Sequence, residues 1–345
     1  MPRIVVNTRV LGAQVTGVQR YTLELLNRWD DTAERIAPAC SRRGLAGQAW
    51  EQIVLPARLG GRLLFSPSGS GPLETSRQVL TIHDTAVLDC PESFSRTYGS
   101  WHRFLLPKLA RRAKQIITVS QFVKERVVSC LGVCANKVVV IPNGVSARFR
   151  PDAVLHVEEA LTAVRVPSQK YILSVGSLEP RKNLKRLFRA WDRVQSRAPK
   201  DVWLVIVGAS GDPGVFGDTQ LERPPARTFL AGHVEDGLLP SLYAGAIAMV
   251  YPSLYEGFGL PPLEAMASGT PVLTGNRSSL PELVRDCGLL VDPFDEGEIA
   301  EGIYRLLTDA TLREELRGKG LVRAKQFSWE ETARKTLEVL RAAAA

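Results

Sequence analysis

The sequence of 345 residues has few of the residue types from which disulfide frameworks and metal centres are built. It has five cysteines, an odd number, scattered along the chain at Cys40, Cys90, Cys130, Cys134 and Cys287. Such a set favours reduced thiols in the cytosol over disulfide bonds. Only four histidines are present, and none lies near the closely spaced cysteines 130 and 134, so no structural zinc site is expected.

The patterns of a membrane-spanning helix and of several cofactor sites are also missing. No apolar run reaches the roughly 18–20 residues of a membrane-spanning helix. The dinucleotide motif G-x-G-x-x-G does not occur, because the stretch SGSGPLE lacks the third glycine, and G-x-x-x-x-G-K-[ST] does not occur either. No D-x-D pair is present to hold a metal-bound diphosphate. We therefore expect neither a nicotinamide cofactor nor a P-loop, and no metal site.

The excess of positive charge is confined to one half of the chain. Residues 1–165 hold 22 Lys and Arg against 13 Asp and Glu, a difference of +9, whereas residues 166–345 hold 22 against 23, a difference of −1. A basic half indicates an anionic partner: nucleic acid, an anionic membrane surface or a phosphorylated acceptor. Solvated surface arginines would give the same count, so composition leaves both interpretations open.

Short apolar runs alternate with helical patterns from the start of the chain. The strands predicted in the first half lie at Arg3–Asn7, Val79–Asp84, Gln115–Ser120 and Lys137–Val145. These runs are too apolar for a sheet with one wet face. A parallel sheet covered by helices on both faces is therefore expected.

A second series of the same kind follows residues 146–169, where the pattern loosens and where we place the linker. The predicted fold class is α/β, with two tandem doubly wound, Rossmann-like domains facing across a cleft. We predict domains at residues 1–160 and 161–327, and a terminal helix at 328–345 that crosses back to the first domain. In such sheets, ligands bind beyond the carboxyl ends of the strands.

One loop after a predicted strand, within Tyr251–Leu273, carries the strongest sign of a binding site. Glu256 and Glu264 lie eight positions apart around glycines and prolines. Pro261 and Pro262 suit a first helical turn, and the glycines before them let a ligand approach the backbone. The helix start offers N–H groups and a positive dipole end to an anion, while carboxylates accept hydrogen bonds from sugar hydroxyls.

The stretch E-GFGLPPL-E, followed by AMASGTPVL, resembles the signature of retaining, nucleotide-sugar-dependent glycosyltransferases of family 4, which have the GT-B fold. The resemblance covers nearly the whole chain, through TGVQRYTLELL, TIHDTAVLDCPESF, TVSQFVKERVV, VIPNGV, LSVGSLEPRKNL and AGHVEDGLLPSLYAGA. The H-D pair together with EPRKN is most similar to the mannosyltransferase subgroup that builds bacterial O-antigen and exopolysaccharide chains. One such motif is weakly specific, but six in order at family spacing are strongly specific.

This resemblance implies roles for residues of the loop. Glu256 would contact the hydroxyls of the donor sugar, and Glu264 would hold the ribose of the nucleotide. Gly259 and Leu260, beside Gly257, would give backbone N–H groups to the diphosphate.

Other residues of the second domain would complete the donor site. Lys182 and Arg181 would neutralise the diphosphate as it leaves, because glycosyl transfer develops negative charge on the leaving phosphate. Many family members carry an arginine where this sequence has Ser177. Arg181 is therefore assigned as its substitute at a site that Ser177 borders. His233 and Val234 would border the nucleotide base through backbone contacts.

Two residues of the first domain are further candidates. His83 ends a predicted strand and, by resemblance, would lie near the reacting sugar and help to position the acceptor. Gly17 lies in the first strand–helix loop, where related enzymes approach the donor phosphate or the acceptor.

The function expected from this resemblance is retaining transfer of a hexose from a nucleotide diphosphate sugar to a glycan or a polyprenyl-diphosphate-linked acceptor. Mannose from GDP-mannose is the best match by subgroup, no cofactor is needed, and no nucleic acid is expected as a partner. An epimerase or phosphorylase of the same fold and, less favoured, a basic nucleic-acid-binding module are the alternatives.

A basic segment with aromatic residues, Trp101–Lys114, bears on localisation. An interfacial helix touching anionic lipid near a lipid-linked acceptor would have this composition, and so would a core-packed helix with a wet basic face. We expect a cytoplasmic protein that is peripheral to the inner face of the plasma membrane if the first interpretation holds.

Overall fold

The structure is a computed structural model that describes residues 4–12, 16–29, 32–39, 44–212, 214–216 and 222–345. Three features of the sequence analysis fall partly outside these residues: Arg3 at the start of the first predicted strand, positions 13–15 of the loop before Gly17, and Cys40. Within the described residues, none of the other four cysteines forms a disulfide bond.

The chain divides into two compact units. The first contains Met1–Pro91, Arg96–Gly144 and Phe327–Ala345, and the second contains Glu92–Ser95 and Val145–Gln326. The first boundary lies earlier than the expected position after residue 160. The reason is local packing: Pro151–His156 (η6) and Val157–Val164 (α7) pack against Leu239–Gly245 (α9) in the second unit.

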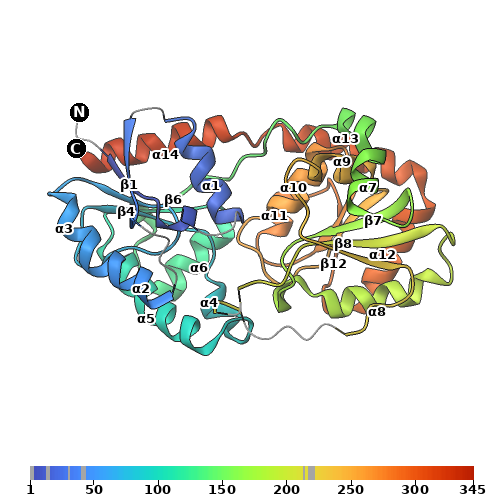
Figure 1. Cartoon of the computed structure of the whole chain (residues 1–345), viewed down its shortest axis with the longest axis horizontal. Helices are drawn as coiled ribbons and strands as arrows, with labels where there is room; N and C mark the ends of the chain where they lie inside the picture. Colours follow the sequence, from blue (N-terminus) through green and yellow to red (C-terminus); the bar gives the residue numbers. More distant parts are fainter. Residues whose placement is uncertain (1–3, 13–15, 30–31, 40–43, 213, 217–221) are drawn as a thin grey trace. The chain divides into compact units, whose positions relative to one another are not determined.

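Each unit is built on a parallel sheet of six strands (Figure 1). The first sheet contains β1 (Ile4–Asn7), β2 (Ala33–Ile36), β3 (Leu64–Ser66), β4 (Gln78–Ile82), β5 (Gln115–Thr118) and β6 (Val138–Val140). The second contains β7 (Lys170–Val175), β8 (Val202–Val207), β9 (Thr228–Gly232), β10 (Ala248–Tyr251), β11 (Val272–Gly275) and β12 (Leu289–Val291). The prediction of two doubly wound α/β sheets is confirmed.

Helices flank both sheets. The first unit has η1 (Arg9–Gly12), α1 (Gly17–Leu26), α2 (Gly44–Ala49), the π-helix η3 (Trp50–Val54), α3 (Leu55–Leu59), α4 (Ala86–Asp89), α5 (Arg96–Arg112), α6 (Gln121–Leu131), η5 (Ala135–Lys137) and α14 (Trp329–Ala344). The second has η6, α7, η7 (Pro180–Lys182), α8 (Leu184–Gln195), α9, α10 (Leu260–Ala267), α11 (Leu280–Val284), α12 (Glu296–Thr308) and α13 (Ala310–Ala324). The short η4 (Pro91–Ser93) lies where the chain passes between the units.

The strand order predicts one point in each sheet at which a ligand could bind. The second sheet runs β12-β11-β10-β7-β8-β9, so the chain leaves β7 toward one edge and returns at β10 to build the other. The first sheet, β2-β1-β3-β4-β5-β6, reverses in the same way between β1 and β3. The loops after the strands splay apart at such a reversal and leave a crevice for ligands. The loops after β7 and β10 are therefore the first place to search for a site.

The hydrophobic core of the second unit holds the strands from which these loops extend. The apolar face of α8 buries Leu187, Phe188 and Trp191 against the central strands, and Ile299 and Ile303 of α12 pack beside them. A Cβ at Gly208, at the end of β8, would lie 1.9 Å from the carbonyl oxygen of residue 176, and its φ is +143°. Only glycine fits between the two strand ends.

The terminal helix α14 completes the first unit and lies beside α1 (Figure 1). Trp329 is buried, and the Trp29 indole donates to the Ala333 carbonyl at 3.1 Å. A Cβ at Gly144 would lie 2.1 Å from the Trp329 nitrogen, so the chain before the linker must touch the start of α14. At the other end, Lys114 donates to the Ala343 carbonyl at 2.7 Å, a favourable cation at a helix C-terminus.

Candidate active site

The loop after β10 leads into α10 (Leu260–Ala267), and Pro261 and Pro262 lie in the first turn of this helix, as the sequence suggested. Gly259 is the N-cap residue, with φ of +106°, and a side chain there would press on Leu280 and Leu283. Prolines follow in the first turn. The turn thus presents the N–H groups of Gly259 and Leu260 beyond the end of the strand, where an anion is stabilised by the helix dipole.

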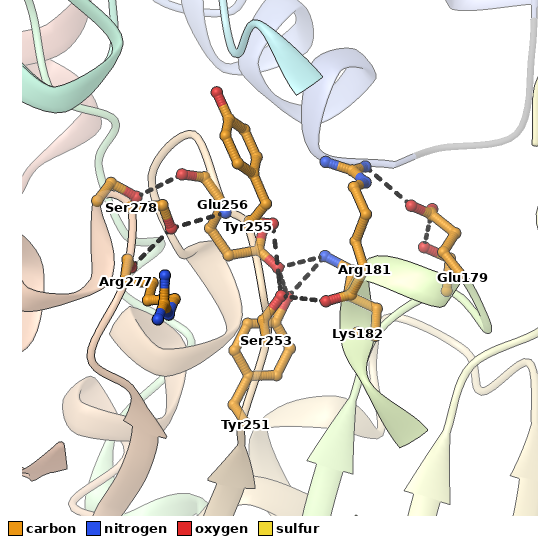
Figure 2. A network of polar contacts seen from close by, with 11 residues as sticks. Glu179, Arg181, Lys182, Tyr251, Ser253, Tyr255, Glu256, Arg277 and Ser278 are labelled. Carbon is orange, nitrogen blue, oxygen red and sulfur yellow. Dashed lines mark hydrogen bonds and ion pairs between the residues drawn. The ribbon is translucent and has the colours of Figure 1, made fainter. Parts of the chain in front are cut away.

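Glu256 lies in this loop at the centre of a polar network (Figure 2). Its carboxyl oxygen Oε1 accepts three hydrogen bonds: from Lys182 Nζ at 2.7 Å, from the Tyr251 hydroxyl at 2.8 Å and from the Ser253 hydroxyl at 2.6 Å. Lys182 Nζ also donates to the Tyr251 oxygen at 2.7 Å. Among the described residues no hydrogen bond reaches Oε2 of Glu256. One oxygen is therefore saturated by the protein and the other is left for a ligand.

The backbone of Glu256 is held as firmly as its side chain. Its N–H donates to the Ser278 hydroxyl at 2.9 Å, and its carbonyl accepts from the Ser279 hydroxyl at 2.9 Å. Both serines follow β11, and Ser278 has φ of +57°. The carboxylate is thereby positioned by groups from three neighbouring strand ends, namely those of β7, β10 and β11.

Charge in this network keeps Glu256 ionised. Burial of the carboxyl acts to raise its pKa, but the charges of Lys182 and Arg181 and the hydrogen bonds outweigh burial, so the pKa lies below its ordinary value. Burial, together with the negative charge of Glu256, raises the pKa of the Tyr251 phenol well above its ordinary value. At neutral pH the network thus contains a carboxylate and a neutral phenol donor.

Arg181 belongs to the same turn, η7, but its guanidinium has a different partner. It is 9% exposed and donates to Glu179 at 2.8 Å, while the Ser177 hydroxyl donates to the other oxygen of Glu179. The Arg181 carbonyl accepts from the Ser253 hydroxyl at 2.9 Å. The position that lacks the family's arginine, Ser177, is therefore linked through one carboxylate to the arginine proposed as its substitute.

The carboxylate of Glu264 is held from a different helix. It lies in the second turn of α10, is 7% exposed and accepts from the Tyr243 hydroxyl of α9 at 3.1 Å. Gly257 lies in the loop between the two glutamates. The spacing of eight positions therefore brings two buried carboxylates to one turn and gives them separate partners.

The remaining candidate residues lie farther out or in the other unit. His233 and Val234 follow β9, which is two strands from β7, and Val234 is buried. In the first unit, His83 follows β4 and Gly17 is the first residue of α1, with its surface exposed. Within the second unit, the structure thus brings Glu256, Lys182 and Ser177 with Arg181 into adjoining networks.

His83 is held in one tautomer. Its Nε2–H donates to the Pro67 carbonyl after β3 at 2.7 Å, and the Tyr21 ring meets the imidazole edge-on at a centroid distance of 4.8 Å. Burial lowers the pKa of His83, so the ring is neutral at pH 7 and Nδ1 is an acceptor.

Sequence reasoning missed a further buried carboxylate, which lies in the first unit. Glu51, on the π-helix η3, is 0% exposed. It accepts from Asn7 at 2.5 Å, from two nitrogens of Arg9 at 3.3 Å each, and from the Ser70 hydroxyl. It also missed Tyr251, Ser253 and Ser278. The first two flank the signature as YPSLYEG and could have been read as strand-end ligands, whereas nothing in the local sequence marks Ser278 or Glu51.

Two absences are recorded for the described part of the chain. No cluster of three His, Cys, Asp or Glu side chains there could hold a metal ion. None of the helices there combines the length and the apolar character that crossing a membrane requires.

Comparison with known proteins gives a consistent result. A family model described as "Glycosyl transferases group 1" matches residues 162–321, and one described as "Glycosyltransferase Family 4" matches residues 73–149. The chain is 35% identical over 268 residues to the O-antigen chain mannosyltransferase B of Escherichia coli, covering 77% of this chain and 70% of that protein. It is 33% identical over 352 residues to the O-antigen chain mannosyltransferase RfbU of Salmonella typhimurium, covering 90% and 93%.

Among solved structures, the sucrose-phosphate synthase from Thermosynechococcus elongatus is similar with a TM-score of 0.75 at 19% identity, over 99% of each chain. At that identity the likeness concerns the fold, which is GT-B.

Proposed function

The chain belongs to glycosyltransferase family 4, and on that premise we propose that it transfers mannose from GDP-mannose to a glycan or polyprenyl-diphosphate-linked acceptor in polysaccharide or O-antigen assembly. Membership makes it a retaining hexosyltransferase with a nucleotide-sugar donor and a glycan acceptor. The choice of mannose is supported by the two relatives named above, both of which are mannosyltransferases.

The observation that carries the site assignment is the half-occupied carboxylate of Glu256. Lys182, Tyr251 and Ser253 saturate Oε1, and the charges of Lys182 and Arg181 together with the hydrogen bonds of Lys182 and Ser253 keep the group ionised. Oε2 then accepts a hydrogen bond from a hydroxyl of the donor sugar, and the fixed carboxylate orients that sugar. Charge-assisted hydrogen bonds of this kind are stronger than neutral ones, and a preformed acceptor costs little reorganisation.

The leaving diphosphate is the second part of the site. As the bond from the anomeric carbon to the phosphate oxygen breaks, negative charge grows on that oxygen. Lys182 and the N–H groups of Gly259 and Leu260 at the start of α10 stabilise it. Arg181, held by Glu179, adds a second cation close by. The same phosphate oxygen accepts the proton of the attacking hydroxyl, so attack and departure share one face of the sugar and the configuration is retained.

The nucleotide lies along the second unit. Glu264 accepts hydrogen bonds from the ribose hydroxyls, and Tyr243 orients its carboxylate. Gly257 lets the backbone approach the diphosphate, Ser177 borders it, and the backbone of His233 and Val234 contacts the base.

In the first unit, the residues proposed for acceptor binding are His83 and Gly17. His83, with Nδ1 as an acceptor, binds a hydroxyl near the reacting centre, and Gly17 leaves room for the substrate before α1.

A cytoplasmic protein at the inner face of the plasma membrane fits the surface of α5. This helix buries Leu105, Leu106 and Leu109 and carries no acidic residue. Its Phe104 is 49% exposed, with Lys108 Nζ 3.5 Å from the ring centroid. Such a basic and aromatic face binds anionic lipid close to a lipid-linked acceptor.

The test is a product analysis with the purified protein. GDP-mannose, GDP-fucose, UDP-glucose and UDP-galactose are supplied with a polyprenyl-diphosphate glycan, and the anomeric configuration of the new linkage is read by NMR. The expected result is α-linked mannose from GDP-mannose alone. Transfer from a UDP-sugar would contradict GDP-mannose as the donor. Release of a sugar phosphate that depends on orthophosphate would show that the enzyme is a phosphorylase and would contradict the proposed transfer.

A further inference from the structure

An exposed aromatic ring lies beside the active-site network. Phe294 follows β12 and is 49% exposed. Arg277 and Arg186 both place their guanidinium carbons over its ring, at 4.8 Å and 5.0 Å from the centroid. Cation–π contacts of this kind hold the ring in place, so little side-chain entropy is lost when a ligand stacks on it.

The ring forms one wall of a shallow hollow of about 410 Å³. The hollow is lined by Arg193, Asp292, Phe294, Asp295 and Glu296. Asp292 and Asp295 each use Oδ1 to accept backbone N–H groups, which fixes both side chains. Glu296 is paired with Arg193 at 2.6 Å. The hollow therefore combines an apolar face with oriented hydrogen-bond acceptors and a donor.

The hollow is connected to the Glu256 network in two ways, by a hydrogen bond from Asn183 and by the neighbouring residues Arg277 and Ser278. The Pro293 carbonyl, next to Phe294, accepts from the Asn183 side chain at 2.6 Å, and Asn183 directly follows Lys182. Arg277, over the ring, directly precedes Ser278, whose hydroxyl binds the Glu256 N–H. Lys182 and Ser278, which hold Glu256, are thus chain neighbours of residues that contact Phe294 or the residue before it.

We propose that Phe294 and this hollow form a carbohydrate subsite that holds a sugar unit of the glycan acceptor or of the growing chain. The inference rests on the proposed function and adds to it a second point of contact for the glycan. A pyranose presents a face of C–H groups that stacks on an aromatic ring and an edge of hydroxyls that needs acceptors and donors. The three carboxylates of the hollow are balanced by Arg193 in its lining and by Arg186 and Arg277 over the ring, so the site has little net charge and a neutral glycan fits best.

The experiment measures glycan binding directly, without turnover. Linear trisaccharides of mannose, glucose and galactose are examined by saturation-transfer NMR with the full-length protein and with three variants. Phe294→Ala removes the ring, Phe294→Trp restores an aromatic face, and Val322→Ala trims an exposed side chain on α13 as the control. Circular dichroism and the GDP-induced rise in Tm confirm that each variant is folded and binds nucleotide.

The expected result is that at least one trisaccharide binds the wild type, Phe294→Trp and Val322→Ala, and that Phe294→Ala weakens its binding about tenfold. The inference is overturned if none of the trisaccharides binds the wild type, or if Phe294→Ala binds as tightly as the wild type. A missing GDP response would count against the proposed nucleotide and leave the trisaccharide result standing, so the two proposals fail separately.

Discussion

Each of the two units buries a glutamate against a cation at the carboxyl edge of its sheet, and the two pairs are used differently. In the first unit, Glu51 is 0% exposed and both of its oxygens are occupied, by Asn7, Arg9 and Ser70. In the second, only Oε1 of Glu256 is occupied by described residues. A saturated carboxylate joins chain segments, whereas a half-occupied one has binding capacity left over. Burial and a neighbouring cation are common to both carboxylates, whereas the number of hydrogen-bond donors at each oxygen distinguishes them.

The largest effect expected from this comparison is a loss of stability at Glu51. Glu51→Ala should lower the free energy of unfolding by about 3–5 kcal/mol, because it leaves Arg9 and Asn7 without their buried partner. Urea unfolding followed by circular dichroism measures the change, and Glu51→Gln, which keeps part of the hydrogen bonding, should lose less. A Glu51→Ala protein that is stable but inactive would break the comparison, since Glu51 would then serve the substrate.

A loss of turnover at Lys182 is expected next. Lys182→Met keeps the aliphatic stem and removes the charge that stabilises the leaving phosphate, so kcat should fall about 10²–10³-fold. The matched control is Lys185→Met, an exposed lysine three positions further along in α8. Equal activity of wild type and Lys182→Met would remove Lys182 from the proposed site.

The pH dependence of stability sharpens the comparison at Glu256. Its pKa in the folded protein lies below the ordinary 4.5, so the ionised form contributes stability above pH 4.5 that is lost as pH falls through the folded value. Each unit of lowering corresponds to about 1.4 kcal/mol. Unfolding of wild type and Glu256→Gln between pH 7 and pH 4 should therefore show a difference that is constant above pH 5 and shrinks below. A difference that grows toward acid would contradict the assigned direction.

The smallest effect is expected at the other end of the signature. Tyr243→Phe removes one neutral donor from Glu264, which costs about 1 kcal/mol. The Kd for GDP should rise about fivefold with kcat unchanged, as measured by calorimetry and initial rates. A change in kcat with an unchanged Kd would place Glu264 at the reacting sugar instead of the ribose.

Much of the fold was predictable because its signals are local. Apolar strands, the prolines that open α10 and the glycine before them identify the second unit's switch-point loop without any knowledge of tertiary contacts. The position of Glu256 beyond a strand end could be predicted from the same alternation of strand and helix patterns.

The parts of the site that could not be predicted depend on contacts between distant positions. Glu51 meets Arg9 across 42 positions and Lys182 meets Glu256 across 74, and no periodicity records such pairs. The link from Ser177 through Glu179 to Arg181 spans only four positions, but it depends on the rotamers of the turn. For the same reason, the motif alone could not show that one oxygen of Glu256 is saturated.

The last helix of the chain has a consequence for synthesis. Residues 327–345 complete the first unit, where Trp329 lies against Gly144 and Lys114 holds the final turn. On the ribosome, the second unit emerges with all of its segments before the first has received its last piece. A nascent chain stopped before α14 therefore leaves Trp29 and Tyr21 without the helix that they contact in the complete unit.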